Sequence, residues 1–223
     1  MNKAIFKLAI FIIIVLLSAC EKDIRSNKVD KINFVDYVNP LMGTDSDYSL
    51  SNGNTYPAIA TPWGMNFWTP MTSKMGDGWT YKYDENKIRG IKQTHQPSPW
   101  INDYAAFSLM ATTGELKFQE DERESWFSHK AETVKPYHYS VYLADYDVTA
   151  EVTPTERASQ FKFTFPDSED SFIMLDAFYK GSMVKIIPKE RKIIGYCRNN
   201  SGGVPENFHN YFVAEFDKDF DVN

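Results

Sequence analysis

A short stretch of the chain, THQPSPWINDYAAF, combines side chains that suit sugar recognition. It carries His95, Trp100, Asn102 and Asp103, and Trp79 precedes it in the segment GDGWTY. A pyranose ring offers an apolar face to an aromatic ring and hydroxyl groups to histidine, amide and carboxylate side chains. We therefore predict that these five residues bind a carbohydrate. The alternative is that the tryptophan-bearing loops only cover one end of a sheet.

The sequence contains no recognisable motif for nucleophilic hydrolysis. A Gly-x-Ser-x-Gly segment and a glycine-rich phosphate loop are absent, and the four histidines lack the close spacing of a zinc site. Cys197 has no histidine motif nearby, so we interpret it as a strand thiol rather than a nucleophile. No pair of carboxylates in the sequence is a good candidate for acid and base catalysis.

Aspartate and asparagine residues around Gly53 have the side-chain types of a calcium loop. An EF-type loop needs oxygen ligands at alternate early positions, followed by a glycine that makes the sharp turn. Counted from Asp45, the glycine position is occupied by Leu50, so the spacing fails. We interpret the cluster as turn-forming residues and predict no metal site.

The first part of the chain, MNKAIFKLAIFIIIVLLSAC, is typical of an export signal. Lys3 and Lys7 give it a positive start, and the apolar run after them is shorter than the about 20 residues that span a bilayer. Its ending resembles a bacterial lipobox, in which Cys20 is lipidated and becomes the first mature residue. We expect residues 1–20 to be a lipoprotein signal peptide and Cys20 a lipid anchor, which places the protein in the cell envelope, periplasmic or on the outer-membrane surface. A plain secretory peptide is the alternative.

Residues 21–33, EKDIRSNKVDKIN, are polar and charged, as in a flexible tether. The remaining residues 34–223 are enough for one domain with a sizeable core. The formal net charge of −6 excludes the basic surface that nucleic-acid binding requires. Once Cys20 is lipidated, only Cys197 remains, so no intramolecular disulfide is available and stability must come from packing.

Apolar and polar residues alternate in the second half of the chain, from Tyr137 to Phe216, which predicts β-strands. In YHYSVYL, for example, Tyr139, Val141 and Leu143 share one face. Similar runs are QFKFTFP, SFIMLDAF, VKIIP, KIIGYC and YFVAEF. The segment FQEDERESWFSHKAE is the one helical candidate, and its charge favours a turn or a single short helix. We predict an all-β domain built as an antiparallel β-sandwich.

Several longer motifs occur in a fixed order: YVNPLMGT, GNTYPAIATPWGM, GWTYKYDENKIRGIKQTHQPSPWINDYAAFSLM, FSHKAETVKPYHYSVYL, VTAEVTPTERASQFKFTFP and YFVAEFDKDF. In this order they resemble the amino-terminal domain of glycoside hydrolase family 92, the exo-acting α-mannosidases of glycan-degrading bacteria. The resemblance covers about Val35 to Phe220. Several long motifs in order are much more specific than any one of them alone.

The resemblance implies a β-sandwich of the galactose-mutarotase-like supersandwich type, which packs in the full-length family against a larger (α/α)6 helical barrel. It implies calcium-dependent, inverting hydrolysis of terminal α-mannosides, with the general acid, the general base and most calcium contacts in the barrel. This chain stops before the barrel. The resemblance therefore implies no catalytic residues in this chain, a sandwich that is incomplete at its carboxy end and a fragment that is inactive alone.

The five predicted sugar-binding residues match family loops that face the barrel and help to build the mannose pocket: Trp79, His95, Trp100, Asn102 and Asp103. For Asp103 we expect substrate positioning or bonding at the domain interface rather than proton transfer. Two residues depart from the family pattern. Ala105 stands where the family often has glycine, which bears on the local backbone, and Trp63 stands where it usually has phenylalanine.

Two functions from different classes follow from these features. The first is the substrate-pocket-contributing domain of a glycan-degrading α-mannosidase, with mannose-containing glycans and the barrel as partners and the membrane reached through the lipid anchor. The second is a free-standing carbohydrate-binding surface lipoprotein. A truncated product without function is a third interpretation. The ending YFVAEFDKDFDVN stops just after a predicted strand, which favours a fragment of a larger enzyme over an evolved binding module.

Overall fold

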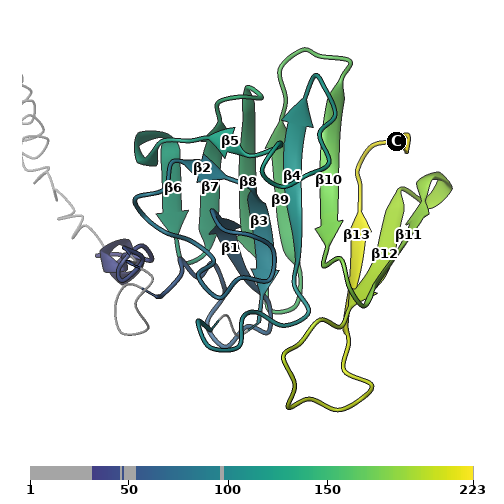
Figure 1. Ribbon diagram of the computed structural model, residues 1–223. Helices are drawn as coiled ribbons and strands as arrows, with labels where there is room; N and C mark the ends of the chain where they lie inside the picture. Colours follow the sequence, from purple (N-terminus) through teal and green to yellow (C-terminus); the bar gives the residue numbers. More distant parts are fainter. Residues whose placement is uncertain (1–31, 46, 48–53, 96–97, 223) are drawn as a thin grey trace, which may run out of the picture. The chain divides into compact units, whose positions relative to one another are not determined.

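The computed structural model describes residues 32–45, 47, 54–95 and 98–222 (Figure 1). One compact unit runs from Phe34 to Asn223. The predicted signal peptide, its anchor Cys20 and residues 21–31 of the predicted tether lie outside the described residues. No helix in the described ranges is long and apolar enough to cross a membrane.

The described residues are almost entirely β-structure, and the strand pairs are antiparallel. One four-stranded sheet has the order β1-β3-β4-β10 and contains β1 (Phe67–Met71), β3 (Gly90–Thr94), β4 (Phe107–Thr113) and β10 (Ser171–Ala177). The other has the order β6-β7-β8-β9 and contains β6 (Glu132–Lys135), β7 (His138–Leu143), β8 (Val148–Pro154) and β9 (Ser159–Thr164).

Two smaller sheets accompany them. The first contains β11 (Ser182–Ile187), β12 (Lys192–Cys197) and β13 (Asn210–Glu215), and Figure 1 shows it beside β10. The second pairs β2 (Lys87–Ile88) with β5 (Ser125–Trp126). The helical turns of the described chain are short 3₁₀ segments: η1 (Phe34–Tyr37), η2 (His129–Ala131) and η3 (Pro188–Glu190).

The core lies between the two four-stranded sheets. Trp68 of β1 makes edge-to-face contacts with Phe161 of β9 and Phe107 of β4, at ring-centroid distances of 4.7 and 5.7 Å. Such contacts stabilise a core beyond the area that they bury. Phe107 also stacks on Phe212 of β13 at 4.4 Å, which joins the three-stranded sheet to the same core. The domain is therefore the antiparallel β-sandwich that the sequence predicts.

The strands predicted in the second half are confirmed. β7, β9, β10, β11, β12 and β13 coincide with the alternating runs, and Tyr139, Val141 and Leu143 are buried on one face of β7. The charged segment FQEDERESWFSHKAE contains turns, the two-residue β5 and the short helix η2 rather than a long helix, as predicted. The strands β1, β3 and β4 in the first half were not predicted, because nearly all of their residues are buried and no polar alternation marks them.

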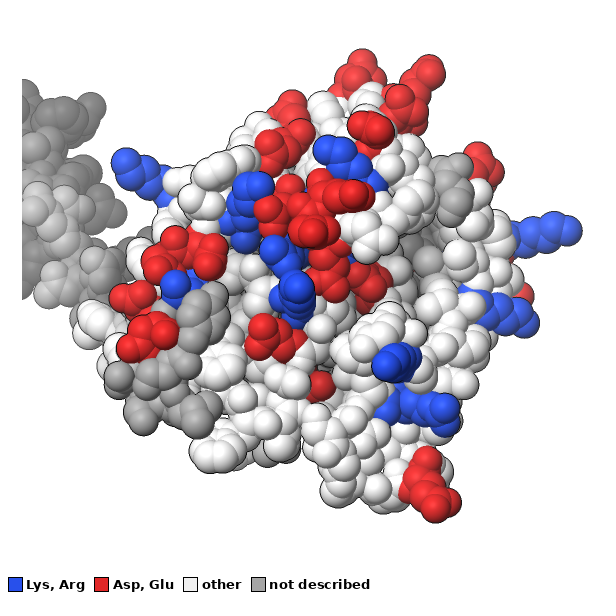
Figure 2. All heavy atoms as spheres, in the orientation of Figure 1, with Lys and Arg blue, Asp and Glu red and all other residues white. Residues whose placement is uncertain are grey.

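Acidic and basic side chains are interspersed on the face drawn in Figure 2, without a continuous basic patch. Some of them pair closely: Glu124 accepts from Lys87 at 2.7 Å and from Arg89 at 3.0 Å. This mixed pattern differs from the row of cations with which proteins follow a phosphate backbone.

Candidate functional site

A crevice of about 620 Å³ opens between four segments that are far apart in the sequence. It is lined by residues 74–77, 102–103, 178–181 and 198–201. The second of these segments belongs to the stretch that we predict to bind sugar. Ligand sites are concave and carry a few polar groups that orient the ligand, so this crevice is the candidate functional site.

The first loop of the site, residues 72–80, connects β1 to the segment before β2. The backbone N–H of Thr72 donates to the carbonyl of Thr80 at 3.0 Å and closes the loop at its base. Within the loop, the N–H of Trp79 donates to Asp77 Oδ1 at 3.0 Å, a turn typical of aspartate. A Cβ at Gly78 would lie 2.1 Å from the carbonyl oxygen of Ser98, so glycine is needed here for contact with the second loop.

The second loop, residues 95–106, connects β3 to β4 and is organised around Asp103. Oδ1 of Asp103 accepts from the backbone N–H groups of His95 at 3.2 Å and Tyr104 at 3.0 Å. The N–H of Asp103 donates to the carbonyl of Gly76 at 3.0 Å, which joins this loop to the first one. The Asp103 carboxylate therefore stabilises the conformation of its own loop without any bound ligand.

The third loop, residues 198–209, connects β12 to β13 and attaches to the second. Asn199 Nδ2 donates to the carbonyl of Asp103 at 3.1 Å, and the N–H of Ala105 donates to the carbonyl of Asn199 at 2.8 Å. Ser201 Oγ donates to the carbonyl of Ile101 at 2.7 Å. Three loops thus meet at the backbone around Asp103.

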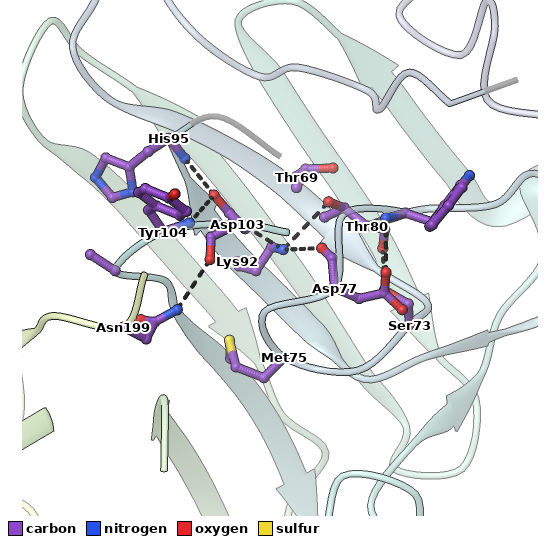
Figure 3. A network of polar contacts seen from close by, with 12 residues as sticks. Thr69, Ser73, Met75, Asp77, Thr80, Lys92, His95, Asp103, Tyr104 and Asn199 are labelled. Atoms are coloured by element: carbon purple, nitrogen blue, oxygen red, sulfur yellow. Dashed lines mark hydrogen bonds and ion pairs between the residues drawn. The ribbon is translucent and has the colours of Figure 1, made fainter. Parts of the chain in front are cut away.

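A buried ion pair lies behind the crevice. Lys92 Nζ on β3 is 3.1 Å from Asp103 Oδ2, and both side chains are fully buried. Nζ also donates to Thr80 Oγ1 at 3.4 Å and to the carbonyl of Asp77 at 3.5 Å (Figure 3). Burial lowers the pKa of Lys92, while the charge of Asp103 opposes that lowering. The ammonium group therefore contacts both the first and the second loop.

The five predicted sugar-binding residues fall at or near this site. Asn102 and Asp103 line the crevice. Trp100, which is 78% exposed on the same loop, and Trp79, which is half-buried on the first loop, are not among its lining residues. His95 does not line the crevice, and Figure 3 shows its ring beside Tyr104. Desolvation lowers the pKa of His95, and Asp103 acts in the opposite direction. The sugar-binding roles of these residues stay predictions.

The backbone on both sides of Asp103 is left-handed. Asn102 has φ 62° and Ala105 has φ 50°. This conformation costs a residue such as Ala105 roughly 1–2 kcal/mol, whereas asparagine adopts it more readily. Trp63, the other departure from the family pattern, also has a positive φ of 62° and is 97% exposed.

Lys92 and Asn199 support or line the site but were not predicted from the sequence. Lysine normally faces solvent, so nothing in the strand sequence GIKQT indicates that Lys92 is buried. Asn199 lies in a polar turn segment, RNNSGG, that looks like an ordinary connection. Tyr56 lies near Asp103: burial, reinforced by the Asp103 charge, raises the pKa of Tyr56 to about 12.

The crevice can bind and orient a ligand, but its carboxylates are already engaged. In the described chain these carboxylates are Asp77, which accepts from Trp79, and Asp103, which is paired with Lys92. The described ranges contain no group of three or more His, Cys, Asp and Glu side chains placed to hold a metal ion. The residues of the crevice therefore do not fit a calcium ion. Burial raises the pKa of Cys197, the opposite of what a reactive thiol requires.

Several solved structures resemble this chain, whereas no curated protein matches it. The family GH92 inverting mannosidase BT2199 from Bacteroides thetaiotaomicron is 50% identical, with a TM-score of 0.78 over 83% of this chain and 25% of the other. The family GH92 α-mannosidase BT3965 from the same species is 32% identical, with a TM-score of 0.72 over 84% of this chain and 26% of the other.

The chain thus spans about a quarter of the length of these two mannosidases. The family model that describes the N-terminal domain of glycosyl hydrolase family 92 matches residues 37–223, nearly the whole compact unit. The resemblance seen in the motifs and the sandwich seen in the structure agree with this match. The chain belongs to glycosyl hydrolase family 92, as an N-terminal domain of that family.

Proposed function

We propose that the chain is the N-terminal, substrate-pocket-contributing domain of an exo-acting, calcium-dependent, inverting α-mannosidase that removes terminal α-mannosides from glycans. The observation that carries the proposal is the crevice around Asp103, in a chain 50% identical to an inverting mannosidase of the family. A mannose-like ligand is further supported by the relative BT3965, which was solved in complex with mannoimidazole.

The chemistry itself is assigned to residues outside this chain. Inverting hydrolysis needs an acid and a base carboxyl group about 6.5–9.5 Å apart, with room for a water molecule between the base and the sugar. Asp77 Oδ1 accepts from the N–H of Trp79 and Asp103 is paired with Lys92, so both carboxylates already support loops of the crevice. We place the acid, the base and the calcium ligands in the helical barrel, which would complete the pocket.

In the proposed reaction, the role of this domain is to bind and orient the terminal mannose. The exposed ring of Trp100 can pack against the apolar face of the sugar, and the side chain of Asn102 can bond to hydroxyl groups. Asn199 Oδ1 is a buried acceptor with no hydrogen-bond partner in the described chain. Because buried polar atoms are normally paired, a sugar hydroxyl is a fitting donor for it.

Mannoside binding by the crevice is the test of this function. We expect the chain to bind methyl α-mannoside with a dissociation constant of about 1 mM or weaker, since we propose that the barrel supplies the other contacts to the sugar. Trp100→Ala and Asn102→Ala should each weaken binding by about three- to tenfold, the equivalent of roughly 1 kcal/mol. Chemical-shift titration by NMR measures this. Trp63→Ala, on an exposed tryptophan outside the three loops that form the crevice, is the matched control.

The same titration separates the leading proposal from the alternative of a free-standing carbohydrate-binding surface lipoprotein. A free-standing module has to hold its sugar alone, so a dissociation constant of about 10 μM or tighter would favour the alternative. Shifts that map away from the crevice, or equal losses in Trp63→Ala and Trp100→Ala, would contradict both proposals.

We also propose that the protein is a cell-envelope lipoprotein anchored through Cys20. In that case Cys20→Ala should remain as a precursor or in the soluble fraction, because the thiol that receives the lipid is missing. The measurement is membrane fractionation with labelling by a fatty-acid analogue, and Cys197→Ala is the matched control. Unchanged acylation in Cys20→Ala would rule out this anchor.

A further inference from the structure

Strand β3 carries a lysine directly behind the wall of the crevice. Lys92 Nζ contacts Thr80 Oγ1 and the carbonyl of Asp77 in the first loop, and Asp103 Oδ2 in the second (Figure 3). We propose that Lys92 is a positioning residue, whose ammonium group holds these two loops together and thereby sets the crevice in its sugar-binding shape. The inference rests on the proposed function, because the sugar is the ligand concerned.

The match between donors and acceptors supports a positioning role. An ammonium group has three donors, and Lys92 Nζ has three oxygen neighbours. Two of these neighbours, from Thr80 and Asp77, belong to the first loop, and the third belongs to Asp103. Without the cation, the Asp103 carboxylate and the Asp77 carbonyl would lose the donor that they share, and only the hydroxyl proton of Thr80 would remain between the two loops. The loops would then separate or rotate.

The cost of burying a lysine points in the same direction. Both Lys92 and Asp103 have no exposed side-chain surface. Apolar side chains of similar volume often stabilise a fold as well as a buried ion pair does, or better. A purely structural role therefore gives little reason for a charge at this position, whereas aligning two loops does.

The backbone beside Asp103 is strained, and the contacts of Lys92 help to keep it in that conformation. Asn102 and Ala105 both have left-handed φ values, and Asn102 lines the crevice. Such conformations persist only where the surroundings over-determine them, and they cluster at functional sites. Here the surroundings are the ion pair of Lys92 with the Asp103 side chain and the bonds of Asn199 to the backbone of Asp103 and Ala105. Lys92 thus controls where Asn102 is presented to a ligand.

The first arm of the test reads the loops directly. The chain has five tryptophans, and labelling with 5-fluorotryptophan gives one fluorine NMR signal for each. Trp79 reports on the first loop and Trp100 on the second, while Trp63 and Trp126 report on other segments. Lys92→Met should shift or broaden the signals of Trp79 and Trp100 and leave those of Trp63 and Trp126 in place.

Matched variants keep the test informative if Lys92→Met folds poorly. Lys92→Met/Asp103→Asn removes both charges, so no unpaired ion remains buried. Arg89→Met removes a cation near Lys92 in the sequence that pairs with Glu124 and does not line the crevice. The double variant should still move the Trp79 and Trp100 signals, and Arg89→Met should not.

The second arm measures the affinity for methyl α-mannoside in wild type, Lys92→Met, Asp103→Asn and the double variant. If Lys92 acts through Asp103, loss of the lysine weakens binding about tenfold, and the double variant binds no worse than the weaker single variant. Unmoved Trp79 and Trp100 signals in a folded Lys92→Met variant, or unchanged affinity, would overturn the proposal.

The two arms also separate this proposal from the proposed function. If the wild-type chain binds no mannoside, then the mannoside-binding role fails for this chain. The fluorine signals still decide whether Lys92 positions the loops. If the wild type binds and Lys92→Met binds equally well, the mannoside role stands and the positioning role fails.

Discussion

The 223-residue chain will release no mannose from 4-nitrophenyl α-mannoside or from α-linked mannobiose, with or without added calcium. Enzymes accelerate such reactions by at least about 10⁶-fold, and an inverting mannosidase reaches this only with an acid and a base on opposite sides of the anomeric carbon. The crevice offers Asp77 and Asp103, and both are engaged in holding loops. The full acceleration should therefore be missing.

Mannose release is measured by chromatography of the sugar products over a long incubation. The relative BT2199, an inverting mannosidase with about four times the length of the matched region, is the positive control under the same conditions. Calcium-dependent release that stays with the chain through purification, and disappears in Asp103→Asn, would show that the catalytic groups lie in this domain after all.

Lys92→Met will lower the free energy of unfolding by about 3–5 kcal/mol, because it leaves the Asp103 carboxylate buried without its cation. For a domain of this size the melting temperature falls by about 2–4 °C for each kcal/mol, so a loss of roughly 6–20 °C is expected. The measurement is thermal unfolding followed by circular dichroism at neutral pH.

The double variant Lys92→Met/Asp103→Asn should recover most of this loss, since neither charge remains. Arg89→Met is the control, and it should cost less than about 1 kcal/mol, because the Arg89–Glu124 pair is partly exposed. If Lys92→Met and Arg89→Met lowered the melting temperature equally, the buried Lys92–Asp103 pair would contribute no more to stability than the partly exposed Arg89–Glu124 pair.

Strands were predictable where one of their faces is exposed. The period-two pattern of Tyr139, Val141 and Leu143 identified β7, and similar alternation identified β9 to β13. The pattern fails for β3 and β4, since neighbouring structure covers nearly all of their residues. Those two strands lead into and out of the second loop. The strands that support the site were therefore the ones that the sequence did not predict.

The candidate site was predictable from its side-chain chemistry but not from its supports. Asn102 and Asp103 were identified because polar hydrogen-bonding residues stood beside tryptophan in one loop, and both line the crevice. Lys92 was not, because a lysine in a short strand normally faces water. Asn199 escaped for another reason: its bond to Asp103 joins residues 96 positions apart, and no local pattern records such a contact.

The long sequence separation of the contacts made by the third loop also predicts the order in which parts of the domain fold. The bond between Ser201 and Ile101 spans 100 positions, and the bond between Asn199 and Asp103 spans nearly as many. Contacts between distant residues form slowly, because a long loop has to close before they stabilise anything. The third loop should therefore attach after the sheets have formed. In a refolding experiment, β-sheet signal will return first and competence to hold a sugar will return last.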